Sequence, residues 1–185
     1  IDGIISLGGG GGTSIGSAAM RALPIGFPKV MVSTLASGNT TPYVGSRDIV
    51  LVPSIVDVAG INRISRPIFA RAAGAICGMV EIKVPAGQDR PLIAASMFGN
   101  TNDCVLAART ILEQAGYEVL VFHATGTGGR TMESLIDSGI IAGVLDLTTT
   151  EWADELVGGI LSAGPTRLDA AGRTGTPAVV APGCI

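Results

Sequence analysis

Glycine clusters that directly follow short apolar runs constrain the fold of this chain more than any other feature of its sequence. The run from Ile4 to Leu7 ends at five consecutive glycines, Gly8 to Gly12, and the run from Glu118 to His123 is followed by the segment Thr125 to Gly129. Glycine permits tight turns and a close approach of the backbone to a ligand, because it has no Cβ. Each cluster stands before a stretch with helical spacing, so the pattern predicts buried strands that turn sharply into helices.

Strands and helices alternate along the whole chain. The predicted strands are residues 4–7, 29–34, 48–52, 92–97, 118–123, 141–147 and 177–181. The predicted helices are residues 15–23, 62–80, 102–114, 130–138 and 151–161. This alternation is typical of parallel sheets joined by right-handed crossovers. The fold class is therefore predicted as α/β, with two small Rossmann-like parallel-sheet lobes of three α/β/α layers. The polar stretch 83–90 is the one linker-like segment, so the lobes are expected at residues 1–85 and 86–185.

The first glycine cluster is a candidate anion site. Ligands of parallel sheets bind outside the carboxyl ends of the strands, and a helix N-terminus attracts negative charge there. Glycine amides can converge on an anion without obstruction by Cβ atoms, and two hydroxyl groups follow them. The cluster has no Walker A lysine and does not fit the strict dinucleotide pattern. A turn needed only for helix packing is the alternative. The candidate binding residues are Gly9, Gly10, Gly11, Gly12, Thr13 and Ser14.

The second cluster repeats this logic in the other lobe. Arg130 lies within it and is expected to contact a phosphate or a carboxylate, because such charge-assisted bonds are strong. Glu133 is a candidate for a metal or a ribose hydroxyl, and a solvated glutamate of a first helical turn is the alternative. The candidate binding residues are Gly126, Thr127, Gly128, Gly129, Arg130, Thr131 and Glu133.

A third strand-to-helix turn, with the candidate residues Gly99, Asn100 and Thr101, is equally compatible with a ligand contact and with an ordinary helix cap. His123, the single histidine, stands at a strand end, where a packed core residue is the simpler interpretation. No Ser-His-Asp order and no pair of catalytic carboxylates is recognisable, so catalytic residues stay unassigned and an enzymatic role stays open.

The composition of the chain limits the classes of partner that the protein is expected to bind. A net charge of −3 with scattered arginines and 4% aromatic residues disfavours direct nucleic-acid binding. No apolar run reaches the length of a membrane span. The three separated cysteines have no metal-ligand spacing, so no metal site is predicted and reduced thiols of a cytoplasmic protein are expected. The helix segment from Ala70 to Met79 carries one charge, Arg71, and is expected to be covered on most sides, between the lobes or across a homodimer interface.

Several segments together resemble a known family. They are GGTSIGSAAMRALPIGFPKVMVSTLASG, PYVG, VDVAGINRISRPIFARAAGAICGM, MFGNT, FHATGTGGRTMESLI and VAPGC, and they cover nearly the whole chain. They are similar to the Tm-1-like ATP-binding proteins, whose members are longer and have two Rossmann-like subdomains. The resemblance implies an internal fragment with an incomplete first lobe, and ATP, alone or with Mg²⁺, as the ligand of the glycine turns. A regulatory module that uses the nucleotide structurally, or an enzyme of a phosphorylated or carboxylated metabolite, remain the alternatives.

Overall fold

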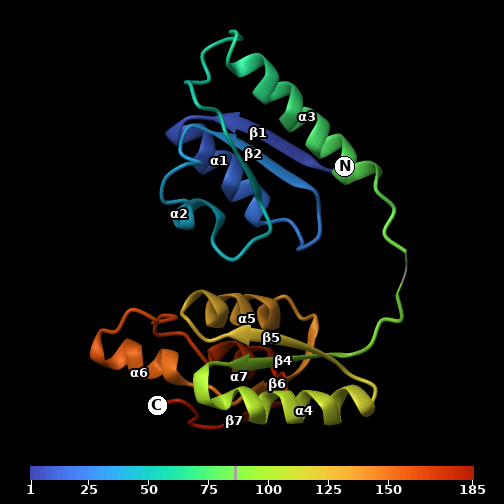
Figure 1. The fold of residues 1–185 in the computed structure, drawn as a ribbon, viewed down its shortest axis with the longest axis vertical. Helices are drawn as coiled ribbons and strands as arrows, with labels where there is room; N and C mark the ends of the chain where they lie inside the picture. The colour runs from blue at the N-terminus through green and yellow to red at the C-terminus, as the bar shows by residue number, and fades with distance from the viewer. Residues whose placement is uncertain (86) are drawn as a thin grey trace. The chain divides into compact units, whose positions relative to one another are not determined.

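The computed structural model describes residues 1–85 and 87–185, which divide into two compact units, Ile1–Ala86 and Gly87–Ile185 (Figure 1). The first unit holds a three-stranded parallel sheet and the second a four-stranded parallel sheet, and helices flank both. The predicted α/β class with Rossmann-like lobes is therefore confirmed. Among the described residues, no helix combines the length and apolar character that crossing a bilayer requires.

The first unit follows a simple winding order. Its elements are β1 (Ile4–Gly8), α1 (Gly10–Arg21), β2 (Lys29–Ser33), α2 (Thr41–Val44), β3 (Val50–Pro53) and α3 (Ser65–Glu81), and the sheet order is β1-β2-β3. Side chains alternate across β2, because successive residues of a strand point to opposite faces. Val30 and Val32 pack with Ala72 of α3, whereas Met31 lies beside Gly16 of α1. The two helices therefore cover opposite faces of the sheet.

A buried lysine fixes the connection between α1 and β2. The ammonium group of Lys29 is fully buried and donates to the carbonyl oxygens of Pro24 at 2.6 Å and Phe27 at 3.0 Å. It also pairs with Asp48 at 2.7 Å. A buried charge is tolerated only where such partners replace water. Lys29 is therefore part of the scaffold and not a free phosphate ligand.

In the second unit, the chain adds strands first on one side of the unit's first strand and then on the other. Its elements are β4 (Leu92–Met97), η1 (Gly99–Thr101), α4 (Asn102–Gln114), β5 (Glu118–His123), α5 (Thr127–Asp137), β6 (Ile141–Asp146), α6 (Thr150–Val157), α7 (Asp169–Thr174) and β7 (Ala178–Val180). The sheet order is β5-β4-β6-β7. The chain thus moves outward from β4 to β5 and then returns to the other side of β4. This reversal places a topological switch point between the carboxyl ends of β4 and β6.

Two apolar cores sandwich the second sheet. On one face, Ala94 and Val144 pack with Met132 and Ile136 of α5 and Ala170 of α7. On the other face, the core residues Ala95, Val105 and Val119 are joined by the partly buried Ile93, Met97 and Leu112. Figure 1 shows α4 and α5 on opposite sides of this sheet. Because successive side chains of a strand point to opposite faces, the same strands supply apolar side chains to the cores on both faces of the sheet.

Both helices after the glycine clusters begin earlier than predicted. Helix α1 starts at Gly10 instead of residue 15, and α5 starts at Thr127 instead of residue 130. The first amides of a helix have no intrahelical acceptor. Glycines can nevertheless form this first turn, because the packing of the preceding strand holds it in position. Helix α3 begins at Ser65, two residues before Pro67, because proline fits the first helical turn. The clusters are therefore helix N-termini more than loops.

Candidate functional site

The first glycine cluster lies at the carboxyl end of β1, as predicted, and forms the N-terminus of α1. Gly9 is the extended N-cap residue and supplies no side-chain cap, and the first turn of the helix contains no acidic residue. A Cβ placed on Gly10 or Gly11 would meet no heavy atom within 4 Å. Gly10 and Gly11 are also exposed, so the first turn of the helix, where the amides lack intrahelical acceptors and the helix dipole is positive, borders solvent.

The two hydroxyl residues of this cluster, Thr13 and Ser14, both make hydrogen bonds within the protein. Thr13 is buried, and its hydroxyl lies 3.3 Å from the carbonyl oxygen of Gly8 and 2.6 Å from Oγ of Ser33. Ser14 donates back to the carbonyl oxygen of Gly10 at 3.1 Å. Neither side chain caps the helix, because the helix begins before them; Thr13 points into the protein and Ser14 stays on its exposed surface. The open part of the cluster is Gly9 to Gly12.

Two side chains from later loops approach the open cluster. The position of a Cβ on Gly9 would lie 3.7 Å from Oγ1 of Thr34, which directly follows β2, and 3.9 Å from Oδ1 of Asp57. Both residues are exposed, and Asp57 accepts a hydrogen bond from the amide of Val58 at 2.8 Å. Asp57 could not be placed here from the sequence, because it lies 48 positions after Gly9 and only the pairing of three strands brings the two residues together.

The second cluster, at the N-terminus of α5, already holds an anion from its own chain. Oε1 of Glu151 accepts hydrogen bonds from the amide of Gly126 at 2.6 Å and from the amide of Gly129 at 3.0 Å. The Glu151 side chain is completely buried. A carboxylate at a helix N-terminus satisfies amides that the helix itself leaves free. The place where a phosphate was predicted is therefore filled by Glu151.

A buried arginine binds the same carboxylate. Arg167 donates from Nε to Glu151 at 2.7 Å and makes a bidentate pair with Asp146 at 2.5 and 2.9 Å. Burial alone lowers the pKa of Arg167, but the hydrogen bonds and charges of Asp146 and then Glu151 outweigh burial, so this pKa is raised. The three residues link the end of β6, the start of α6 and the loop before α7 in one ionic cluster.

The charged residues of the second cluster have structural partners. Arg130 donates to the carbonyl oxygen of Ser162 at 2.9 Å and to the hydroxyl of Thr127 at 3.3 Å, and the hydroxyl of Thr131 donates to the carbonyl oxygen of Thr127 at 2.9 Å. Arg130 is nevertheless exposed, so its guanidinium borders solvent. Its position favours a clamp between α5 and the segment after α6 over the predicted phosphate contact.

Glu133 binds the start of α7. Its carboxylate accepts from the amide of Leu168 at 3.0 Å and from the amide of Ala170 at 2.8 Å. Arg167 adds a third contact at 3.3 Å. Glu133, which belongs to α5, therefore caps the N-terminus of α7. This differs from both roles that were considered from the sequence.

Gly128 and Gly129 are required by packing. A Cβ on Gly128 would overlap the backbone carbonyl of His123, and one on Gly129 would overlap the Glu151 carboxylate. His123 is exposed and its ring meets that of Phe98 edge-on, with centroids 5.2 Å apart at 66°, so it is not the core residue that the simpler interpretation expected. Substitution of these glycines would disturb the fold before it tested any ligand.

The third turn lies at the switch point and joins the ionic cluster. The hydroxyl of Thr101 lies 2.7 Å from that of Thr148 and accepts from the amide of Phe98 at 3.1 Å. Ser96 accepts from the amide of Thr148 at 2.9 Å and donates to Asp146 at 2.6 Å. Gly99 and Asn100 are exposed, and Gly99 has a positive φ of 54°. Thr101 stands at the N-cap position of α4, but its hydroxyl bonds to Phe98 and Thr148 and makes no cap hydrogen bond to that helix.

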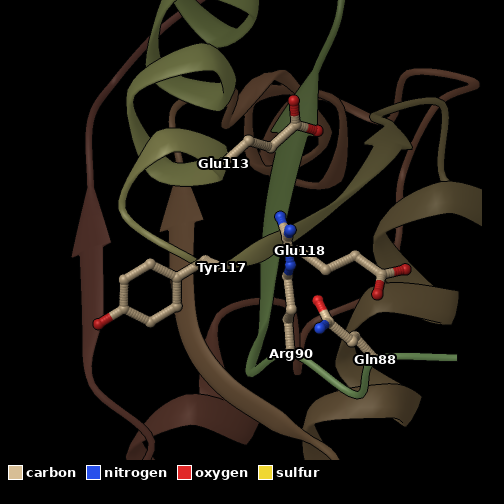
Figure 2. Close-up of a pocket in the computed structure, with 5 residues that line it drawn as sticks. All are labelled: Gln88, Arg90, Glu113, Tyr117 and Glu118. Atoms are coloured by element: carbon tan, nitrogen blue, oxygen red, sulfur yellow. The ribbon is translucent and has the colours of Figure 1, made fainter.

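A polar pocket lies at the opposite edge of the second sheet. Its lining residues belong to the segment before β4, the end of α4 and the start of β5, and they are Gln88, Arg90, Glu113, Tyr117 and Glu118. In the view of Figure 2, the Tyr117 ring and the Glu118 carboxylate lie on opposite sides of Arg90. This edge holds the amino ends of β4 and β5, so the pocket contains none of the predicted site residues. Ligands of parallel sheets bind at the other edge.

The buried cluster of Asp146, Glu151 and Arg167 was missed from the sequence. Asp146 ends an apolar strand, which is the one pattern that could have drawn attention to it. Glu151 resembles an ordinary first-turn glutamate, and Arg167 stands in a glycine- and threonine-rich segment without periodicity. An ion pair between residues of such separate segments leaves no recognisable pattern in the local sequence.

Comparison with known proteins identifies the relatives of both units. The model of the N-terminal domain of an uncharacterised protein family (UPF0261) matches residues 1–85, and that of its C-terminal domain matches residues 90–185. A UPF0261 protein of Clostridium tetani is 62% identical over 100% of this chain and 46% of its own length. A UPF0261 protein of Mesorhizobium japonicum is 52% identical over 98% of this chain and 46% of its own length.

A plant relative matches the same region. The ToMV resistance protein Tm-1 of Solanum lycopersicum is 47% identical over 99% of this chain and 25% of its own length. The ToMV susceptible protein of the same plant matches with the same identity and coverage. The chain thus spans about half the length of the bacterial relatives and a quarter of the tomato proteins.

Proposed function

The chain belongs to the uncharacterised protein family UPF0261, and from that premise we propose that Gly9 to Gly12 bind the phosphate groups of a nucleotide. The observation that carries the proposal is the open N-terminus of α1. Three consecutive glycines form its first turn without a side-chain cap, and Cβ positions on two of them meet nothing. Amides that the helix leaves free, together with its dipole, suit phosphate oxygens without a lysine.

The contrast with α5 supports the choice of cluster. Both helices follow a parallel strand through glycines, but the amides of Gly126 and Gly129 already donate to Glu151. An incoming phosphate would have to displace a carboxylate that Arg167 also holds. Such displacement leaves a buried charge without its partners, which is costly. The first cluster requires no displacement, so it is the better phosphate site.

The residues beside the first cluster suit a nucleotide with a bound cation. The carboxylate of Asp57 close to Gly9 would repel bare phosphate oxygens. Mg²⁺ prefers carboxylate and phosphate oxygens and retains several waters, so a single carboxylate can hold it together with phosphates. We therefore expect Asp57 to hold the Mg²⁺ of a metal-nucleotide complex and the hydroxyl of Thr34 to donate to a phosphate oxygen.

ATP is the expected nucleotide because of the resemblance to Tm-1-like ATP-binding proteins. The tomato resistance and susceptible proteins match this chain equally well, so the shared region is proposed to carry a general property and not the resistance itself. Passive binding in a regulatory module and turnover by an enzyme both use such a site. Turnover of a phosphorylated metabolite would require phosphate recognition without a preference for the nucleotide.

Assembly is a further part of the proposal. The helix α3 buries only Ser65 and Ala72 among its 17 residues, and the face with Ala70, Gly74 and Cys77 is exposed. Small residues on an apolar helix allow a second helix to approach closely. We propose that two copies of the protein pack through this face of α3. The free thiols of the three cysteines fit the reducing cytoplasm, which is the proposed location.

Calorimetric titration tests the proposed binding. The protein is titrated with ATP, ADP and ribose 5-phosphate, each with and without Mg²⁺, and phosphate release is followed in the same samples. Binding of ATP and ADP that strengthens with Mg²⁺ supports the proposal, and phosphate release would assign an ATPase. Binding of ribose 5-phosphate with equal affinity favours a phosphorylated metabolite. Absence of heat with all three ligands would contradict phosphate binding.

A further inference from the structure

A second pocket lies at the carboxyl ends of β6 and β7, in the second unit. Its volume is about 380 Å³, and its lining residues are Thr149, Trp152, Leu168, Val180 and Pro182. Small-molecule sites have volumes of about 300–1,000 Å³ and are mostly apolar with a few polar groups. This pocket falls within that size range and its surface is almost wholly apolar, because four lining residues are largely apolar and the fifth, Thr149, is buried. It also lies at the sheet edge where ligands bind in parallel α/β folds.

The ionic cluster described above holds the walls of this pocket in place. The indole nitrogen of Trp152 donates to the backbone carbonyl of Arg167 at 2.6 Å, which fixes the edge of the ring. The next residue, Leu168, is held at a φ of 81° while its amide donates to Glu133. A leucine in the left-handed region is strained, and such strain persists only where the surroundings impose it.

The last wall is tied to the same cluster. The amide of Ala181 donates to the backbone carbonyl of Asp146 at 2.9 Å, and the amide of Thr149 donates to that of Gly183 at 3.1 Å. These bonds anchor the segment that carries Val180 and Pro182 beside the end of β6. The pocket is therefore preorganised, because each wall is fixed by a residue that pairs with, or directly follows, the buried cluster.

The chemistry of the lining selects a flat and uncharged group. Among the described residues, no charged side chain lines the pocket, so an anion would lose its hydration without gaining a partner. Trp152 is the one aromatic residue among those that line the pocket, and its indole nitrogen is already paired, so we expect it to interact with a ligand through its ring.

We propose that this pocket binds a planar, uncharged aromatic ring, such as a nucleobase, stacked on Trp152 and bounded by Leu168, Val180 and Pro182. The site goes beyond the proposed phosphate site, because it lies in the other unit and uses none of the same residues. Ring binding here requires no phosphate and no metal. The buried ionic cluster acts as its scaffold.

Trp152 is the single tryptophan of the chain, so its fluorescence reports directly on this pocket. The protein is titrated with adenosine, benzamide, cyclohexanol and ribose 5-phosphate while the emission of Trp152 is recorded. Saturable changes with adenosine and benzamide, but not with cyclohexanol or ribose 5-phosphate, are the expected result. A preference for adenosine over benzamide identifies a heterocyclic base, and the reverse order identifies a carbocyclic ring.

Matched variants locate the binding. Val180 and Val179 are both exposed neighbours on β7, but only Val180 lines the pocket. Val180→Glu should weaken adenosine binding by about tenfold or more, whereas Val179→Glu should leave it within about twofold. Pro182→Glu, also at an exposed lining residue, serves in place of Val180→Glu if that variant unfolds.

Two results would overturn the inference. One is an unchanged emission with both aromatic probes at millimolar concentration, and the other is an equal response to cyclohexanol, which would show apolar contact without stacking. Failure of the phosphate site is distinguishable from failure of this pocket. If only the phosphate site fails, Trp152 still responds to adenosine while ATP and ADP give no more heat than adenosine does. If only this pocket fails, ATP and ADP still give heat while adenosine leaves the emission unchanged.

Discussion

The amide of Gly126 lies 2.6 Å from Oε1 of Glu151, so the helix N-terminus of α5 is neutralised by a side chain from the next helix along the chain. The amide of Gly129 shares this acceptor at 3.0 Å. An anion-binding turn can therefore serve the fold itself. The same strand–glycine–helix pattern performs two tasks in this protein: one turn accepts an internal carboxylate, and the other is open.

Glu151→Ala should destabilise the protein by about 3–5 kcal/mol, because it leaves Arg167 with fewer partners and two amides unsatisfied. The vacated space should accept a small carboxylate. Formate at fixed ionic strength is expected to raise the unfolding temperature of Glu151→Ala more than that of the unaltered protein. Thermal unfolding measures both effects. Glu113→Ala, which removes an exposed i,i+4 pair, is the control and should change stability by less than about 1 kcal/mol. An absence of formate rescue would argue that the turn closes when Glu151 is removed.

Much of the fold could be predicted from the sequence. The bounds of β4 and β5 were predicted correctly, because each is an apolar run with turn residues on both sides. The location of both glycine clusters at carboxyl ends of parallel strands followed from the same alternation. Within its own unit, only one stripe of the helix from Ala70 to Met79 packs on the sheet, so the cover expected between the lobes or across a homodimer interface stays a prediction.

The candidate site was only partly predictable. Glycines and helix starts are local signals, and they located the open turn at Gly9 to Gly12. The fate of the second turn depended on Glu151 and Arg167, which approach it from segments 22 and 38 positions beyond Gly129. Whether a glycine turn is open or filled is decided by such distant partners. The sequence around the turn does not contain that information.

Gly11→Ala should separate ligand binding from folding. A Cβ here meets nothing within 4 Å, and alanine is favoured over glycine in helices, so stability should stay equal or rise by about 1 kcal/mol. Helical Cα–Cβ bonds tilt toward the N-terminus, so the added methyl group would lie in the path of a phosphate. We expect a loss of ATP affinity of about tenfold or more, measured by calorimetry. Gly172→Ala, in α7 and equally unobstructed, is the control. Unchanged affinity in Gly11→Ala would remove the phosphate from this turn.

The pair of Lys29 and Asp48 should make stability depend on acid pH. Burial of Asp48 raises the pKa of its carboxyl, but hydrogen bonds from Lys29 and the amide of Gly26 outweigh this, so the pKa is lowered. A carboxyl with a lowered folded pKa contributes stability above its unfolded pKa of about 4 and loses it as the pH falls through the folded pKa. Asp48 is partly exposed, so the contribution should be about 1 kcal/mol.

Denaturant unfolding of Asp48→Asn measures this contribution. The difference from the unaltered protein should be constant near neutral pH and shrink below pH of about 4. Asp137→Asn removes an exposed ion pair with Arg173 and serves as the comparison at a surface site. A difference that persists unchanged into acid would assign the effect to the geometry of the loop and not to charge.

The exposed face of α3 predicts how the protein associates. Gly74 is exposed and a Cβ there meets nothing within 4 Å, so Gly74→Glu should leave the folded unit intact while it places a charge on the proposed interface. Sedimentation analysis should show a dimer for the unaltered protein and a monomer for this variant, because burial of an unpaired carboxylate opposes association. Ala107→Glu places the same charge on the exposed side of α4 and should remain dimeric. Mild oxidation adds an independent measure, since Cys77 lies on the α3 face and Cys104 on α4, and both are exposed. Cys77→Ser should reduce intermolecular disulfides more than Cys104→Ser does. A monomeric unaltered protein, or a dimer that survives Gly74→Glu, would show that this face of α3 is not the interface.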